Sequence, residues 1–319
     1  MKLSEPYQEI VDSCRIGSTD LVEFPAPGSR NRIFAKLEYQ NHTGSHYDRV
    51  YPWLLDQLER EGKIHPAHSI LVETTSGNAG ISCGFVAQRR GYRTIIFTPA
   101  GARPRCNQLM RGYGVDVREV SGADYVADAR DAMVTLLREH VDARSGGFRM
   151  YYSPNHSQLE ISCKALVPIV TEALAQAGGS FDCFIGAAGN GSTLRGMGDA
   201  LRRDNPKIRM FGFDPAAAPN AYQIKYGRIP GHTPRVHQLF GVGVWDVEFP
   251  HLTYAVRQLL EDVMIVEDEQ WRQTQLELRA IGYDVGNTSA AAYHLARDFC
   301  RRHDNQRILI VFYDAADHY

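Results

Sequence analysis

The sequence has few lysines and no long apolar run. Only six of its 319 residues are lysine, so few side-chain amines are available for imine chemistry: Lys2, Lys36, Lys63, Lys164, Lys207 and Lys225. No apolar stretch approaches the roughly 20 residues that span a bilayer, and the N-terminal segment lacks the continuous apolar core of a signal peptide. We therefore expect a cytoplasmic protein that does not enter a membrane.

Disulfide and metal-binding patterns are absent as well. The six cysteines are scattered without CxxC spacing, which argues against a disulfide framework or a zinc cluster. The formal net charge is only −2, and no long run carries one sign, so nothing predicts binding to nucleic acid. We expect the ligand to be a small molecule.

What the sequence does contain is an alternation of β-rich and helical segments. Near-continuous apolar strands separated by helical patterns are typical of a parallel sheet covered by helices on both faces, and they predict a doubly wound α/β fold. The least periodic segment, 215–235, is expected to be a long loop. The predicted strands are 32–38, 68–73, 93–97, 115–120, 182–186, 209–214 and 307–313, and the predicted helices include 48–61, 78–90 and 103–113.

Two strand-to-helix junctions are rich in small residues. TTSGNAG (74–80) exposes the first N–H groups of a helix beginning at Asn78, which suits a carboxylate or a phosphate; a helix cap with a glycine turn would look the same without any ligand. GAAGNGST (186–193) offers backbone amides and the hydroxyls of Ser192 and Thr193 to a phosphate. Its glycines also fit a dinucleotide loop, with Asp214 as the ribose-binding acid.

A third segment, NHTGSHYDR (41–49), places two histidines four residues apart. Gly44 favours a loop, no neighbouring set completes a metal site, and Asp48 is expected to cap the following helix. No metal is therefore predicted. The chain has neither a G-x-S-x-G elbow nor a G-K-[ST] phosphate loop, which argues against a serine hydrolase and a P-loop ATPase.

Taken in order, these segments resemble the cysteine synthase branch of the fold-type II (tryptophan synthase β-like) pyridoxal-phosphate enzymes. IFAKLEYQNHTGSHYDR is similar to the family's K-L-E strand followed by N-P-x-G-S-V-K-D-R. ILVETTSGNAGIS resembles the E-P-T-S-G-N-T-G loop, and FIGAAGNGSTLRG the G-T-G-G-T phosphate loop. YDVGNTSAAA and FYDAADHY are similar to the two later family segments, so the resemblance runs from about Arg32 to the last residue.

The resemblance implies two lobes: a small mobile domain at 45–150, and a large domain formed by 1–44 and 151–319. It also implies a homodimer. The substrate carboxylate would be bound by Thr75, Ser76, Gly77 and Asn78, with Asn78 also reaching the cofactor ring hydroxyl. The cofactor phosphate would be bound by Gly189, Asn190, Gly191, Ser192 and Thr193.

The departures from the family lie where the cofactor is made reactive. Tyr47 aligns with the family's cofactor-binding lysine, and a phenol forms no imine with an aldehyde. Ala315 aligns with the serine that meets the pyridine nitrogen, and Cys163-Lys164 with a G-P pair. We therefore expect either that pyridoxal phosphate binds without a lysine at position 47, noncovalently or as an imine with the substrate, or that the protein uses no cofactor.

Three hypotheses follow. The first is an enzyme of amino-acid-related biosynthesis, of lyase or transferase type, whose substrate is an amino acid or a phosphorylated small molecule; Tyr47 acts as acid or base, assisted by His46 and Arg49. Because the ordinary pKa of tyrosine is about 10, a cationic neighbour is needed. The second is a conventional β-replacement or β-elimination enzyme with a relocated lysine, and the third is a non-catalytic ligand-binding relative.

Overall fold

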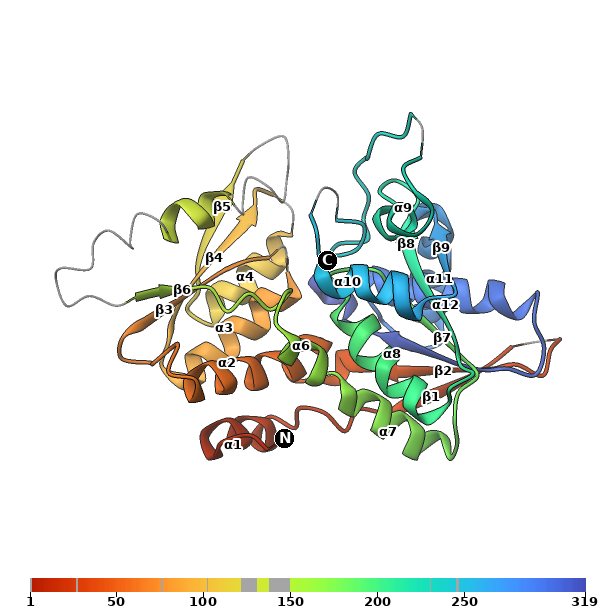
Figure 1. Ribbon diagram of the computed structural model, residues 1–319, viewed down its shortest axis with the longest axis horizontal. Helices are drawn as coiled ribbons and strands as arrows, with labels where there is room; N and C mark the ends of the chain where they lie inside the picture. The colour runs from red at the N-terminus through yellow and green to blue at the C-terminus, as the bar shows by residue number, and fades with distance from the viewer. Residues whose placement is uncertain are drawn as a thin grey trace. The chain divides into compact units, whose positions relative to one another are not determined.

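The structure is a computed structural model that describes residues 2–26, 28–75, 77–101, 103–121, 131–137, 150–229, 231–244 and 247–319. The chain forms two compact units (Figure 1). The smaller unit comprises Met1–Ile16, Tyr47–His156 and Asp317–Tyr319, and the larger unit comprises Gly17–His46 and Ser157–Ala316. The domain limits predicted from the sequence stay a prediction.

The smaller unit is built on a four-stranded, wholly parallel sheet. Its strands lie in the order β5-β4-β3-β6, and each parallel pair needs a crossover connection. Ile70, Val72, Ile95 and Phe97 form an apolar cluster on one face, against which the helical segment 131–137 packs. The elements are α1 (Glu5–Ser13), α2 (Val50–Arg60), β3 (Ser69–Thr74), α3 (Asn78–Arg90), β4 (Arg93–Pro99), α4 (Pro104–Gly112), β5 (Asp116–Val120) and β6 (Met150–Tyr152).

The larger unit contains a six-stranded sheet in the order β1-β2-β10-β7-β8-β9. Only the β1–β2 pair is antiparallel. Its strands are β1 (Leu21–Pro25), β2 (Arg32–Leu37), β7 (Cys183–Ala187), β8 (Arg209–Pro215), β9 (Asp262–Val266) and β10 (Arg307–Phe312). Its helices are α6 (Glu160–Lys164), α7 (Val167–Ala177), α8 (Ser192–Asp204), α9 (Asn220–Tyr226), α10 (Pro250–Tyr254), α11 (Asp268–Ala280) and α12 (Asn287–Cys300).

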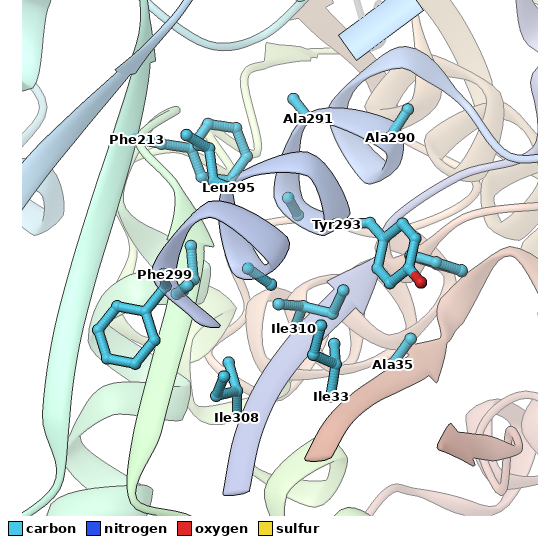
Figure 2. Packing of buried hydrophobic residues seen from close by; sticks show 14 of the residues in the cluster. Ile33, Ala35, Phe213, Ala290, Ala291, Tyr293, Leu295, Phe299, Ile308 and Ile310 are labelled. Atoms are coloured by element: carbon cyan, nitrogen blue, oxygen red, sulfur yellow. The ribbon is translucent and has the colours of Figure 1, made fainter. Parts of the chain in front are cut away.

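Helix α12 closes the main core of the larger unit. Alternate residues of β2 and β10, including Ile33 and Ile310, point to one face of the sheet and share one buried apolar cluster with α12. In this cluster Leu295 of α12 lies beside Phe213 of β8 (Figure 2). The intervening residues of β2 point to the opposite face, where α7 packs. Because of this alternation, Lys36 of β2 points to the face that α7 covers.

The structure confirms the predicted α/β class with mostly parallel sheets and corrects three details. Segment 215–235 is not one loop, because it contains the short helix α9. Strands β1, β6 and β9 were not predicted. Asp48 does not cap α2, whose N-cap residue is Arg49; instead its carboxylate accepts a 2.6 Å hydrogen bond from Ser82 Oγ. Within the described ranges, no helix is both long and apolar enough to cross a membrane.

Candidate functional site

The predicted carboxylate loop joins β3 to α3 in the smaller unit. Its backbone turns tightly, with Gly77 N donating to Thr75 Oγ1 over 3.3 Å. A Cβ atom at Gly77 would stand 2.2 Å from Arg103 Nη1, so the Arg103 side chain would have to move for any larger residue. Helix α3 begins at Asn78 and is long enough to present a positive N-terminal end to an anion. Ser76 lies outside the described residues.

Asn78 is held by a histidine 240 residues away in the sequence. Its Oδ1 lies 2.8 Å from Nδ1 of the buried His318. The carbonyl oxygen of His318 accepts hydrogen bonds from Arg103 Nη2 and Cys106 Sγ, each over 3.2 Å. The guanidinium of Arg103 lies 4.2 Å over the ring of Tyr319. Sequence analysis did not predict this support of the loop by residues 317–319.

Tyr47 lies in a cluster of titratable side chains that local spacing does not reveal. Its half-buried ring meets the ring of His156 edge-on, with centroids 5.5 Å apart. His156 Nδ1 lies 3.3 Å from Tyr51 Oη and 3.5 Å from Glu73 Oε1. Burial raises the pKa of Tyr51 well above its ordinary value, and the Glu73 carboxylate adds to the shift. Tyr51 therefore carries its proton throughout the neutral range.

His46, the other predicted acid–base residue, contacts Tyr313. His46 belongs to the larger unit, where its backbone N–H donates to Tyr313 O over 3.0 Å and its ring lies edge-on to that of Tyr313. The structure thus sets the rings of His46 and Tyr47, although adjacent in sequence, against different partners. The assistance of Tyr47 by His46 and Arg49 stays a prediction.

The predicted phosphate loop follows β7 in the larger unit. A Cβ at Gly189 would stand 2.4 Å from Gly241 O, and one at Gly191 would stand 2.1 Å from Leu252 N. Gly191 also has φ +86°, the left-handed region that favours glycine. Asn190 Oδ1 accepts the backbone N–H of Ser192 over 2.9 Å. These contacts fix the loop where the 13-residue helix α8 begins.

This loop fits the phosphate of pyridoxal phosphate. Ser192 and Thr193 are buried at the N-terminal end of α8, and Ser192 Oγ has no hydrogen-bond partner within the described part of the chain. A buried hydroxyl without a partner costs about 1–3 kcal/mol, so a ligand oxygen there would be stabilising. Backbone N–H groups at the helix end add a positive potential. The loop is therefore suited to hold a phosphate.

Asp214 does not serve as a ribose-binding acid. Its side chain is fully buried at the end of β8, where Oδ2 accepts the backbone N–H of Tyr222 over 2.9 Å. Burial raises its pKa to about 8 from an ordinary 3.8, against the lowering effect of backbone hydrogen bonds. The acid anchors α9 and cannot reach a ligand, which removes the main support for a dinucleotide site.

Ala315 follows β10 and offers only a methyl group. Its backbone N–H donates to Gly44 O over 3.1 Å, and it forms an isolated β-bridge with Val285. Position 315 thus has a fixed backbone and no side-chain hydrogen-bonding group. The side chain of Ala315 therefore cannot donate a hydrogen bond to a ring nitrogen of a ligand.

All six lysines are described, and their environments differ sharply. Lys36 is fully buried on the α7 face of the sheet, where Nζ lies 2.8 Å from Glu172 Oε2 and also donates to Thr19 O. Lys225 Nζ donates to Leu260 O over 2.8 Å. Lys164 is about half exposed and lies 3.3 Å from Glu160. The remaining three are exposed: Lys2, Lys63 and Lys207.

Cys163, which occupies the other position of departure, is a poor nucleophile. Helix α6 packs closely against α8 at this residue, because a Cβ atom at Gly196 of α8 would stand only 2.2 Å from Cys163 O. Burial raises the pKa of the Cys163 thiol to about 11, against the lowering effect of the nearby Arg195 guanidinium. Among the described residues, no group of three or more His, Cys, Asp or Glu side chains is arranged to hold a metal ion.

Comparison with known proteins accounts for this combination of loops. Residues 13–314 match the sequence profile of the family described as pyridoxal-phosphate dependent enzyme. A cysteine synthase of Staphylococcus aureus (strain Mu50) is 32% identical over 230 residues, which cover 72% of this chain and 69% of that protein. A probable cysteine synthase of Bacillus subtilis (strain 168) is 26% identical over 298 residues, covering 92% and 90%.

Solved structures share the architecture. The O-acetylserine dependent cystathionine β-synthase from Helicobacter pylori matches with a TM-score of 0.84 and 24% identity, covering 100% of this chain and 98% of that one. The fold is therefore that of the fold-type II enzymes. The chain belongs to the family of pyridoxal-phosphate dependent enzymes. Within that family it is cysteine-synthase-like.

Proposed function

We propose that this protein is a cysteine-synthase-like enzyme of lyase or transferase type that holds pyridoxal phosphate without a covalent bond to a lysine. Its substrate would be an amino acid or a phosphorylated small molecule. The observation that carries the proposal is that residue 47 is tyrosine, while both anion-binding loops retain the backbone geometry that a carboxylate and a phosphate need.

The state of the lysines supports this proposal over a relocated lysine. Lys36, the lysine nearest to Tyr47 in sequence, is fully buried in an ion pair with Glu172. Moving Lys36 out of this position would break its ion pair with Glu172 and its hydrogen bond to Thr19 O. Lys164 is half exposed and pairs with Glu160 one helical turn away. Both amines are thus engaged with carboxylates of the larger unit.

Each of the two loops would bind a different anionic group. Gly189, Asn190, Gly191, Ser192 and Thr193 would hold the cofactor phosphate. Thr75, Gly77 and Asn78 would hold the substrate carboxylate, and Asn78 would also reach the ring hydroxyl of the cofactor. When bound, pyridoxal phosphate supplies an electron sink for bonds at the substrate α-carbon. The chain's own contribution is to bind, orient and move protons.

We assign the proton-moving role to Tyr47. A phenol with a pKa near ~10 is a weak base at neutral pH, so its surroundings must assist it. His156 packs directly against the Tyr47 ring and is itself placed between Glu73 and Tyr51. His156 therefore supports a proton-moving role for Tyr47, in addition to the assistance by His46 expected from the sequence.

An activity comparison tests the proposal. Binding of pyridoxal phosphate to the wild type and Tyr47→Phe is first followed by absorbance without substrate, and both proteins are then assayed with β-substituted serines. We expect saturable binding without the long-wavelength band of an imine, and turnover that falls about 100-fold or more in Tyr47→Phe. Unchanged turnover would remove the role of Tyr47. An imine band abolished by a single Lys→Ala change would establish the conventional enzyme instead.

The oligomeric state is a separate part of the proposal. We infer a homodimer from the resemblance to the family, and light scattering coupled to size-exclusion chromatography measures it directly. A mass close to twice 35.8 kDa is expected.

A further inference from the structure

The side chain of His318 contacts the side-chain amide of Asn78. The two side chains meet at 2.8 Å through Nδ1 and Oδ1. An imidazole nitrogen is either a donor or an acceptor, and an amide offers a donor on one side and an acceptor on the other. The protonation of Nδ1 therefore fixes the orientation of the amide.

The surroundings of His318 place this contact firmly. Its carbonyl oxygen accepts hydrogen bonds from Arg103 and Cys106, and only 3% of the residue is exposed. Because the amide oxygen of Asn78 can only accept, this contact needs a proton on Nδ1. The Nε2 atom of His318 lies 3.9 Å from Asp317 Oδ1. With both nitrogens protonated, or with only Nδ1 protonated, Nδ1 donates to Asn78 Oδ1.

We propose that His318 is a positioning residue of the site: its Nδ1–H holds Asn78 Oδ1, so that the amide turns its NH₂ group toward the ligand. Asn78 is then a hydrogen-bond donor, and the ligand places an oxygen acceptor against it. The role rests on the proposed function, because Asn78 begins the helix whose N-terminal end receives the carboxylate. His318 itself touches no substrate.

The first measurement concerns the protein without ligand. Nitrogen-15 NMR of the imidazoles, with the His318 signals assigned from their loss in His318→Asn, reports which nitrogens carry protons. A protonated Nδ1 is expected. An unprotonated Nδ1 would overturn the proposal, whatever the protein catalyses.

A matched pair of variants provides the second measurement. The amide nitrogen of asparagine superposes on histidine Nδ1, whereas that of glutamine superposes on Nε2. We expect His318→Gln to weaken the binding of pyridoxal phosphate about tenfold, the scale of one hydrogen bond. His318→Asn should recover the affinity to about threefold of the wild type. Thermal unfolding of both variants serves as the control for folding.

Coupling to Asn78 is the third measurement. In an Asn78→Ala background the difference in affinity between His318→Asn and His318→Gln should vanish, because the donor then has no amide to hold. Equal affinities of the two variants in the native background would contradict the role. A difference that persists in the Asn78→Ala background would contradict it as well.

If the wild type binds no pyridoxal phosphate, the proposed function fails, and the NMR result alone then decides the role of His318. The two failures are therefore distinguishable.

Discussion

The buried carboxyl group of Asp214 should make the stability of this protein fall as the pH rises. Replacing it with asparagine is a conservative perturbation, because the amide oxygen can accept the backbone hydrogen bond that Tyr222 now donates to Oδ2. The amide resembles the protonated acid and cannot ionise. The substitution thus removes the titration and keeps the anchoring of α9.

The magnitude follows from the pKa of about 8 in the folded protein and the ordinary 3.8. Below pH 4 the carboxyl group is protonated in both states and contributes no difference. Between pH 4 and pH 8 the unfolded chain ionises while the folded protein stays protonated, so the wild type loses about 1.4 kcal/mol of stability per pH unit. By pH 7 the loss amounts to about 4 kcal/mol.

The assay is urea unfolding of the wild type and Asp214→Asn at pH 4.5, 5.5 and 7 at constant ionic strength. We expect the free energy of unfolding of the variant to exceed that of the wild type by about 1 kcal/mol at pH 4.5 and by about 4 kcal/mol at pH 7. Asp304→Asn is the control, because hydrogen bonds from Arg30 lower the pKa of that exposed carboxyl group. It should give no gain at pH 7. Parallel pH profiles for the wild type and Asp214→Asn would refute the reasoning.

Two further substitutions test the packing of the larger unit. Glu172→Gln should lower the free energy of unfolding by about 3 kcal/mol, because Lys36 is left fully buried with its charge. Its control, Glu160→Gln, breaks an exposed pair and should change the free energy of unfolding by less than about 1 kcal/mol. Equal effects of the two substitutions in urea unfolding would contradict this. Gly191→Ala should cost about 3 kcal/mol and abolish phosphate binding by calorimetry, since its Cβ meets backbone. Gly178→Ala has a similar φ in open space and should cost about 1 kcal/mol.

Much of the fold could be predicted because its signals are local. The central strands β3, β4, β7, β8 and β10 are near-continuous apolar runs, and α3 begins and ends at the residues expected. Strands β1 and β9 each have only two buried residues at most, and β6 has three residues in all, so they lack such a run. Helix α9 depends on the buried Asp214, which no local pattern reveals.

The candidate site was predictable only in its backbone. The glycine-rich loops are visible in the sequence because close approach to backbone demands small residues, as at Gly189 and Gly191. The side chains that support them come from distant segments. His156 reaches Tyr51 across 105 residues, and His318 reaches Asn78 across 240. No spacing rule within a loop identifies such partners.

The most direct test of the account is chemical trapping of the cofactor. The wild type and Tyr47→Lys are saturated with pyridoxal phosphate, reduced with borohydride, digested and analysed by mass spectrometry. Reduction makes any imine permanent, so the position of a lysine adduct is recorded. We predict no stoichiometric adduct on any of the six wild-type lysines and an adduct at position 47 in Tyr47→Lys. A stoichiometric adduct on one wild-type lysine would contradict the claim that this enzyme binds its cofactor without a lysine.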